Sequence, residues 1–251
     1  MDDCVIYSKQ LAKQVGKELN IPVYLYEFSA TSKDRVNLAE VRSGEFEGMA
    51  EKMKSTQWKP DYGPQKPHKT AGVTAIGARN FLIAYNVNLN TKDKKIATDI
   101  SLDIREQGRN KRNKKGKFVR GKNGEPINIP GTLKSCKAVG WYIEEYGLAQ
   151  VSMNLTNFNE TAPHLAFEET REQARKRGTR VSGSELVGLI PLDAMLSAGK
   201  YYLQKQQRST GIPTMDIIHI AVKSMGLDDL SPFNPNEKII EYRIRDLYGP
   251  L

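Results

Sequence analysis

Residues 58–89 read WKPDYGPQKPHKTAGVTAIGARNFLIAYNVNL, a loop rich in proline and glycine that leads into an alternating apolar stretch. From Phe81 to Leu89 every second side chain is large and apolar, and those between include Ala84, Asn86 and Asn88. A period of two predicts a strand over 81–89 with one apolar face and one partly polar face.

The loop that precedes this strand, from Trp58 to Gly72, is predicted to be stiff. Its three prolines each fix φ at about −65° and restrict the residue before them, whereas Gly63 and Gly72 permit backbone angles or close approaches that a side chain would block. Lysines lie beside Trp58 and Tyr62, so a flat anionic ligand would suit this loop. An ordinary surface connection is the alternative.

The pattern downstream of Phe81 alternates between strand and helix periodicity. A spacing of four predicts a helix over 92–105, and Gly147 between two alternating stretches is typical of a β-hairpin. The order from Phe81 is strand, helix, strand, strand, helix, strand, as in a ferredoxin-like split βαβ unit, so the predicted fold class is α+β. The other elements of this unit are expected at 138–146, 148–155, 163–177 and 184–191.

The ends of the chain carry further amphipathic segments. A helix is predicted over 2–20, a strand over 23–28 and a helix over 37–53 that is broken at Gly44. Two more helices, at 192–206 and 214–225, precede a last strand near 238–244. The predicted inward stripe of the first helix consists of Val5, Leu11, Ala12, Val15 and Leu19.

Bulk composition is that of a soluble globular protein, with 39% hydrophobic and 27% charged residues in 251. No apolar run is long enough for a transmembrane helix, and the acidic start at Asp2 and Asp3 is unlike a secretory signal. Cys4 and Cys136 form no metal-binding spacing and are expected to be free thiols. The cytoplasm is the expected compartment, with no membrane partner.

The net charge of +9 is concentrated in one segment. Between Arg105 and Lys122 there are nine cations and one acid, Glu106, so a local charge of +8 leaves only +1 for the rest. The segment has one aromatic residue, Phe118, and lacks the stacking series of single-strand binders. We expect a long, mobile, solvated insertion over 109–137, with a polyanion contact as the alternative and no nucleic-acid partner.

Several motifs in a fixed order carry a family resemblance. After GPQKPHKTAG at 63–72 and GARNFLIAYNVNL at 77–89 come REQGR at 105–109, GWY at 140–142, AQVSMNL at 149–155 and LVGLIPL at 186–192. Together they resemble the formiminotransferase (glutamate formimidoyltransferase) family over nearly the whole chain. The resemblance implies two facing ferredoxin-like subdomains, of which the first is incomplete, and a homodimer.

The resemblance also implies a division of the chain. Residues 1–79 would be the remainder of the N-terminal subdomain with its folate-binding loop, and 80–251 the C-terminal subdomain with the basic insertion at 109–137. The implied activity is transfer of a formimino group from N-formimino-L-glutamate to tetrahydrofolate, giving 5-formimino-tetrahydrofolate and L-glutamate in histidine degradation. Tetrahydrofolate is the co-substrate, and no metal is expected. The implied folate-binding residues are Gly63, Pro64, Gln65, Lys66, Pro67, His68, Lys69, Thr70, Ala71 and Gly72.

No catalytic residue is assigned. The family handles protons with a histidine in a motif of the type His-x-Gly-Glu-His-Pro-Arg, which this sequence does not contain, so we expect the opening part of the first subdomain to be missing. Of the three histidines, His68 is a weak catalytic candidate and more naturally a folate contact or exposed loop residue. His164 is expected to be structural, and His219 to be packed in an apolar helix.

Two sets of alternatives stay open. Asn86, Asn88, Gln150, Ser152 and Asn154 form either a polar floor for a ligand or the solvent side of a sheet. The chain itself is a transferase, a non-catalytic folate-binding fragment or pseudoenzyme, or a paralogue acting on 5-formyl-tetrahydrofolate, because the loop recognises folate and not the one-carbon group. A helical cyclodeaminase domain, present in some relatives, is not expected.

Overall fold

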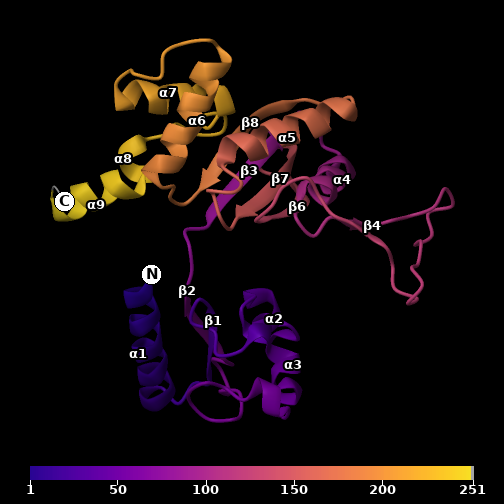
Figure 1. Ribbon diagram of the computed structural model, residues 1–251, viewed down its shortest axis with the longest axis vertical. Coiled ribbons are helices and arrows are strands. Elements are labelled where there is room, and N and C mark those ends of the chain that lie inside the picture. Colours follow the sequence, from indigo (N-terminus) through magenta and orange to yellow (C-terminus); the bar gives the residue numbers. More distant parts are fainter. Residues whose placement is uncertain (250–251) are drawn as a thin grey trace. The chain divides into compact units, whose positions relative to one another are not determined.

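The computed structural model describes residues 1–249, which form two compact units of mixed helix and strand, Met1–Asn80 (unit 1) and the part that begins at Phe81 (unit 2). Figure 1 shows both units with their elements labelled. Unit 2 contains an antiparallel sheet with helices, which confirms the predicted α+β class. None of the helices in residues 1–249 is both long and apolar enough to cross a membrane.

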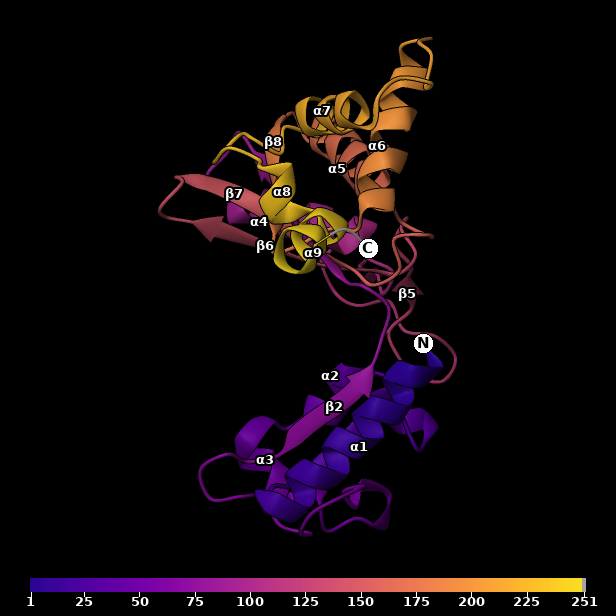
Figure 2. The same ribbon diagram turned by 90° about the vertical axis from the view of Figure 1, so that its left-hand side faces the viewer.

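Unit 1 is built on a pair of parallel strands, β1 (Val23–Glu27) and β2 (Thr74–Ala78). Helix α1 (Asp2–Glu18) lies along β2, as Figure 2 shows. Short helices α2 (Leu38–Arg42) and α3 (Glu45–Lys52) meet at Gly44, whose φ of +88° produces the predicted break. Strand β2 was not predicted, because its sequence TAIGA is short and has small residues at three of five positions, and because its partner lies about 50 residues earlier. The 3-10 turns η1 (Lys33–Arg35) and η2 (Thr56–Trp58) complete the unit.

The buried face of α1 differs from the predicted one. Leu11 and Leu19 are 52% and 58% exposed, and the buried residues are Ser8, Ala12 and Gly16. Small residues are needed there because the helix lies directly against the backbone of the loop: a Cβ at Gly16 would lie 2.7 Å from the amide nitrogen of Gly63. The contact between α1 and Gly63 positions the first residue of the predicted folate loop.

Unit 2 contains the predicted ferredoxin-like sheet. Its strands β3 (Ile83–Leu89), β6 (Cys136–Ile143), β7 (Leu148–Leu155) and β8 (Val181–Val187) lie in the order β6-β7-β3-β8, and every neighbouring pair is antiparallel. This is the strand order of a split βαβ unit. Strand β3 begins at residue 83 rather than 81, and β8 covers 181–187 rather than 184–191.

Both crossover helices cover the same face of this sheet (Figure 1). Helix α4 (Lys94–Ile104) packs on β6 and β7, and α5 (Pro163–Lys176) packs on β3 and β8. The apolar side chains of β3 point into this layer and are fully buried. The polar residues of β3 therefore lie on the opposite face. The central core residues are Ile83, Tyr85, Val87 and Leu89 with Ile100 and Ile104 of α4.

The C-terminal part of unit 2 is helical. Helices α6 (Leu192–Lys205) and α7 (Thr214–Met225) pack on each other, and α8 (Pro235–Lys238) and α9 (Ile240–Tyr248) follow. The predicted strand near 238–244 is wrong, and only Ile239 forms a single parallel bridge, with Ile190. The apolar residues at 240, 244 and 247 have the spacing of one helix face, which the alternation at 240, 242 and 244 obscured.

The prediction of a long loop without strands over 109–137 is also wrong. Strands β4 (Arg109–Asn110) and β5 (Asn128–Ile129) pair, and isolated bridges join Arg112 to Phe118 and Arg120 to Pro126. The basic segment is an ordered β-ribbon, whose turn residues, rather than an apolar alternation, specify the pairing.

Candidate functional site

The Pro/Gly loop of unit 1 begins at a buried ion pair. Arg35 and Asp61 lie 2.8 Å apart, and each side chain is only 8% exposed. Arg35 also donates to the carbonyl oxygens of Gln57 (2.7 Å) and Lys59 (2.6 Å), and Asp61 accepts from the Leu25 amide (2.8 Å). The pair therefore ties the first residues of the loop to β1.

The middle of the loop is held by close backbone contacts. Tyr62 forms an antiparallel bridge to Val23, and Gly63 has a φ of +81°. A Cβ at Gly63 would lie 2.4 Å from the carbonyl oxygen of Ile21, so no other residue fits. This glycine is required by the fold of unit 1, independently of any ligand.

The end of the loop closes on itself. His68 and Gly72 exchange backbone hydrogen bonds of 2.8 and 3.0 Å, and His68 Nδ1 accepts from the amides of Ala71 (3.1 Å) and, more weakly, Thr70 (3.4 Å). The lone pair of Nδ1 therefore stabilises the turn. In this weak catalytic candidate, Nε2 is the ring nitrogen that remains for a ligand. The structure brings His68 to Gly72 together in one small turn.

The predicted aromatic platform is already occupied. Lys52 Nζ lies 3.8 Å from the ring centroid of Trp58, and the Arg35 guanidinium lies 5.9 Å from it. Tyr62 packs in the core against α1 and β1. A ligand ring would have to displace Lys52 to lie on Trp58. The loop lysines Lys59, Lys66 and Lys69, in contrast, are exposed and form no ion pair within residues 1–249.

A hollow adjoins the end of the loop. Its volume is about 500 Å³, and its walls come from Ala71, Gly72 and Val73 of the loop, from α2 and α3, and from β2. Phe46 of α3 lies against Gly72, where a Cβ would be 2.9 Å from its ring. Sites for small molecules are typically about 300–1,000 Å³ and mostly apolar. The remaining walls are Val41, Arg42, Glu45, Glu47, Met49 and Ala75.

The other two histidines differ in environment. His164 is 6% exposed, its ring packs 4.6 Å from that of Tyr201, and its Nδ1 has no partner among the described residues. Burial lowers the pKa of His164 to about 4. His219 is exposed on α7, which corrects the expectation of a packed residue. Neither is placed at the loop or the hollow.

Because His164 is buried, we expect the free energy of unfolding of unit 2 to fall at acid pH. Because its pKa in the folded protein is below the ordinary value of 6.5, the unfolded chain binds more protons between pH 6.5 and about 4. Stability is complete above pH 6.5 and should fall by up to about 3 kcal/mol as the pH drops through this range. Urea unfolding of His164→Gln should show a flatter pH dependence, whereas His219→Gln should match the unmutated chain. Equal slopes in all three proteins would contradict this assignment.

The polar face of the unit 2 sheet carries a connected network. Asn88 and Gln150 are fully buried opposite each other on β3 and β7, and Gln150 Nε2 donates to Asn88 Oδ1 at 2.7 Å. Trp141 Nε1 donates to Gln150 Oε1 at 3.1 Å. The structure therefore brings together Asn86, Asn88 and Gln150 of the predicted floor. Ser152 and Asn154 lie on the same face but form no hydrogen bond with this network within residues 1–249.

Two carboxylates that sequence reasoning missed lie on this floor. Asn86 Nδ2 donates to Glu185 Oε2 (3.2 Å), and Asn88 Nδ2 donates to Asp229 Oδ2 (3.0 Å). Asp229 reaches the sheet because Gly183 lacks a side chain: a Cβ there would lie 2.4 Å from Asp229 Cβ. An acid within the strand predicted at 184–191 was the available signal for Glu185, whereas Asp229 follows α7 and carried no signal.

Aromatic residues form the rim of this floor. Trp141 and Tyr146 are each 40% exposed, and the nearby charge of Glu185 raises the pKa of Tyr146. Glu185 Oε1 accepts no hydrogen bond from any residue in the described part of the chain. The floor therefore presents a free acceptor between aromatic side chains, which suits a ligand with N–H donors.

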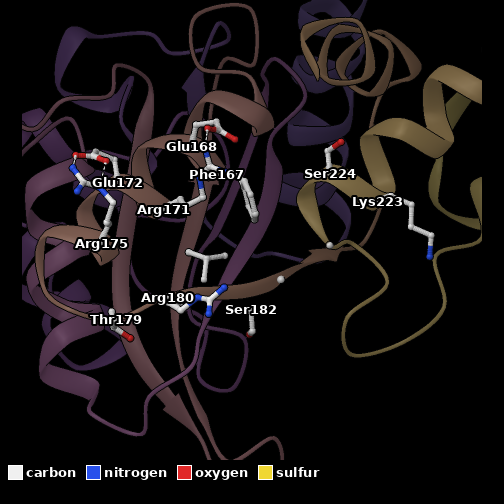
Figure 3. A pocket seen from close by; sticks show the side chains of 13 residues that line it. Phe167, Glu168, Arg171, Glu172, Arg175, Thr179, Arg180, Ser182, Lys223 and Ser224 are labelled. Atoms are coloured by element: carbon white, nitrogen blue, oxygen red, sulfur yellow. Dashed lines mark hydrogen bonds and ion pairs between the residues drawn. The ribbon is translucent and has the colours of Figure 1, made fainter. Parts of the chain in front are cut away.

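A third depression, of about 710 Å³, lies on unit 2 between α5, the start of β8 and α7 (Figure 3). Its arginines on α5 are paired, Arg171 with Glu168 and Arg175 with Glu172. Arg180 lies on the opposite wall in Figure 3. None of the predicted site residues lines this depression.

Comparison with known proteins identifies the family. The formiminotransferase domain matches residues 84–245, and the N-terminal subdomain of that domain matches residues 1–79. Formimidoyltransferase-cyclodeaminase of Dictyostelium discoideum is 42% identical over 247 residues, 98% of this chain and 42% of that protein. The Sus scrofa protein of the same name is 41% identical over 251 residues, 100% of this chain and 43% of its own length.

A further relative is named for the transferase activity alone. Glutamate formimidoyltransferase of Streptococcus pyogenes serotype M1 is 45% identical over 202 residues, 80% of this chain and 60% of that protein. The chain thus spans less than half of the cyclodeaminase relatives and about three fifths of the streptococcal one. With matches along both units and the predicted motif order, the chain belongs to the formiminotransferase family.

Proposed function

We propose that this chain binds a reduced folate at the hollow beside Ala71 and Gly72 and serves in formimino transfer from N-formimino-L-glutamate to tetrahydrofolate. The observation that carries the proposal is the hollow of about 500 Å³ at the end of the loop Gly63 to Gly72. Exposed cations on the same loop, Lys66 and Lys69, suit the carboxylates of a folate tail. Histidine degradation, the cytoplasm and a homodimer belong to the same proposal and rest on the resemblance.

The reaction places clear demands on any site. An amine of the reduced pterin attacks the amidine carbon, and the tetrahedral centre then expels the amine of glutamate. An amine is a poor leaving group unless it is protonated, so a group that exchanges protons near neutral pH is needed. Because His164 is buried and His68 Nδ1 holds a turn, the described histidines suit substrate binding and structure better than proton transfer.

The second candidate function follows from that observation. A non-catalytic folate binder would keep the loop and the hollow and need no proton-handling histidine. A turnover assay of the purified chain with N-formimino-L-glutamate and tetrahydrofolate separates the two, because only a transferase releases glutamate. Formation of N-formyl-L-glutamate and tetrahydrofolate from L-glutamate and 5-formyl-tetrahydrofolate in a parallel assay would instead identify the paralogue.

The floor of unit 2 supplies a second recognition element. A formimino group and the aminopyrimidine edge of a pterin share an N–C–N unit with N–H donors, and a carboxylate oxygen accepts such donors in charge-assisted hydrogen bonds. Glu185 is the acceptor that suits this pattern, because Asn86 holds its Oε2 and its Oε1 is free among the described residues. Because we place the folate at the hollow of unit 1, we assign Glu185 to binding the formimino group.

Glu185→Gln should weaken binding of the ligand that carries this group by about 10- to 100-fold, because a charge-assisted hydrogen bond is lost at a partly buried position. Separate titrations with N-formimino-L-glutamate and with tetrahydrofolate identify which ligand is affected. Glu144→Gln, in the exposed β6–β7 turn, is the matched control and should change neither titration. Unchanged affinity for both ligands in Glu185→Gln would remove the floor from the proposal.

A further inference from the structure

The basic arm, residues 109–129, is an ordered part of unit 2 that the proposed function does not use. Three residues spaced by eight tie its segments together: the Lys111 amide donates to Ile127 (2.8 Å), Ile127 to Val119 (2.9 Å) and Val119 back to Lys111 (2.9 Å). This closed ring of backbone hydrogen bonds joins three chain segments. The arm therefore holds its side chains on a defined scaffold.

The two turns of the arm repeat one arrangement. Arg112 donates from Nη1 to the carbonyl oxygen of Gly116 at 2.8 Å, and Arg120 donates from Nη1 to that of Gly124 at 2.7 Å. Both glycines have positive φ, +76° and +81°, as the tight turns require. A guanidinium has five N–H donors, so each arginine keeps most of its donors for another partner.

The arm carries strong and unneutralised positive charge. Its base is anchored by Arg109, which pairs with Asp99 (3.4 Å) and Asp103 (2.7 Å) of α4. Beyond Arg109 no acid occurs until Glu125. Seven cations lie between them, all exposed and none in an ion pair within residues 1–249: Lys111, Arg112, Lys114, Lys115, Lys117, Arg120 and Lys122.

Like charges on a fixed scaffold repel one another, and a partner with regularly spaced negative charge relieves that repulsion. The arm projects from the sheet and helices of unit 2 (Figure 1), so its cations are accessible from several sides. An elongated polyanion can contact such an arm from more than one side, whereas a flat charged surface can contact only one side. Double-stranded DNA is such a polyanion, because it carries one negative charge per about 1.7 Å of helix axis.

We propose that the basic arm binds the phosphate backbone of nucleic acid without reading its sequence. Base stacking is disfavoured because the one aromatic ring, Phe118, already carries the Arg112 guanidinium 4.2 Å from its centroid. The tips consist of asparagine, glycine and lysine, which lack the apolar wedge that membrane insertion or base-step intercalation uses. We therefore expect the contacts to be made to phosphates. The arm that makes them is a β-ribbon and not the solvated loop that the sequence predicted.

The test is a fluorescence-anisotropy titration of the full chain with labelled duplex DNA, duplex RNA and single-stranded DNA at several salt concentrations. Binding should be independent of sequence, with Kd in the range of about 10⁻⁴–10⁻⁶ M, and log K should fall linearly with log salt. The variant carries Lys114→Gln, Lys115→Gln, Lys117→Gln and Lys122→Gln. At about 0.1 M salt it should bind at least about 50-fold more weakly, with a salt slope smaller by about 2 or more.

The matched control removes four charges elsewhere, through Lys9→Gln, Lys13→Gln, Lys17→Gln and Lys95→Gln, all exposed. Retention of binding by the control and loss by the arm variant supports the proposal. Equal losses in both would show that net charge, not the arm, attracts the polyanion. Absence of binding to all three nucleic acids overturns it, as does tighter binding to poly-L-glutamate or to anionic vesicles than to any duplex.

Discussion

Replacement of Asp61 with alanine is expected to lower the free energy of unfolding of unit 1 by about 3–5 kcal/mol, because it leaves the buried Arg35 charge without its partner. Both side chains are 8% exposed, and Asp61 also accepts from Leu25 N (2.8 Å) and Thr31 Oγ1 (2.5 Å). Chemical denaturation of the chain with Trp141→Phe, followed by the fluorescence of Trp58, reports this unit. Its ring lies close to Arg35, so loss of the pair should also alter the native signal.

The control is an exposed pair of the same kind. Glu51 and Lys54 lie 2.5 Å apart, with side chains 78% and 72% exposed. Glu51→Ala should change stability by no more than about 0.5 kcal/mol, as is usual for surface pairs. Similar losses in Asp61→Ala and Glu51→Ala would contradict the view that the Arg35–Asp61 pair anchors the loop.

Gly72→Val is expected to weaken reduced-folate binding by about 100-fold or more. The φ of Gly72 is +65°, which a β-branched residue adopts only at a cost of about 1–3 kcal/mol, and a Cβ would press on Phe46 at 2.9 Å. Both effects displace the backbone that lines the hollow, and each 1.4 kcal/mol corresponds to about tenfold in affinity. Calorimetric titration with 5-formyl-tetrahydrofolate measures the change.

Two further variants separate binding from folding. Gly116→Val imposes the same kind of backbone strain at φ +76° in the basic arm, where nothing lies within 4 Å of an added Cβ, and should leave folate binding unchanged. Phe46→Ala removes an exposed wall of the hollow without backbone strain and should weaken binding by about tenfold. If Gly72→Val and Phe46→Ala both bind folate normally, the hollow is not the folate site.

The core of unit 2 was predictable because its signals are local and repeated. Alternation along β3 and β7, the four-residue spacing of α4 and Gly147 at the hairpin all pointed to one arrangement. Unit 1 was harder, since β2 has small residues and pairs with a strand far away in sequence. The basic arm was misjudged because its order comes from backbone rings and glycine turns, which leave no hydrophobic periodicity.

The candidate site was partly predictable for similar reasons. The motif between Gly63 and Gly72 could be recognised, and its glycines do occupy positive-φ positions. The hollow beside Gly72 and the reach of Asp229 across Gly183 depend on packing between segments distant in sequence. The contact between Lys52 and the ring of Trp58 also depends on the packing of separate segments. The composition of the loop therefore could not predict it.

A titration of the Trp141→Phe chain with a reduced folate, followed through the fluorescence of Trp58, determines whether the hollow of unit 1 holds the folate. Trp58 is then the only tryptophan, and it packs beside Val41 and Met49, two residues of the hollow. We expect a saturable change in fluorescence that Gly72→Val removes and Gly116→Val retains. A signal that stays flat while the same chain binds folate by calorimetry would show that the folate binds away from the hollow.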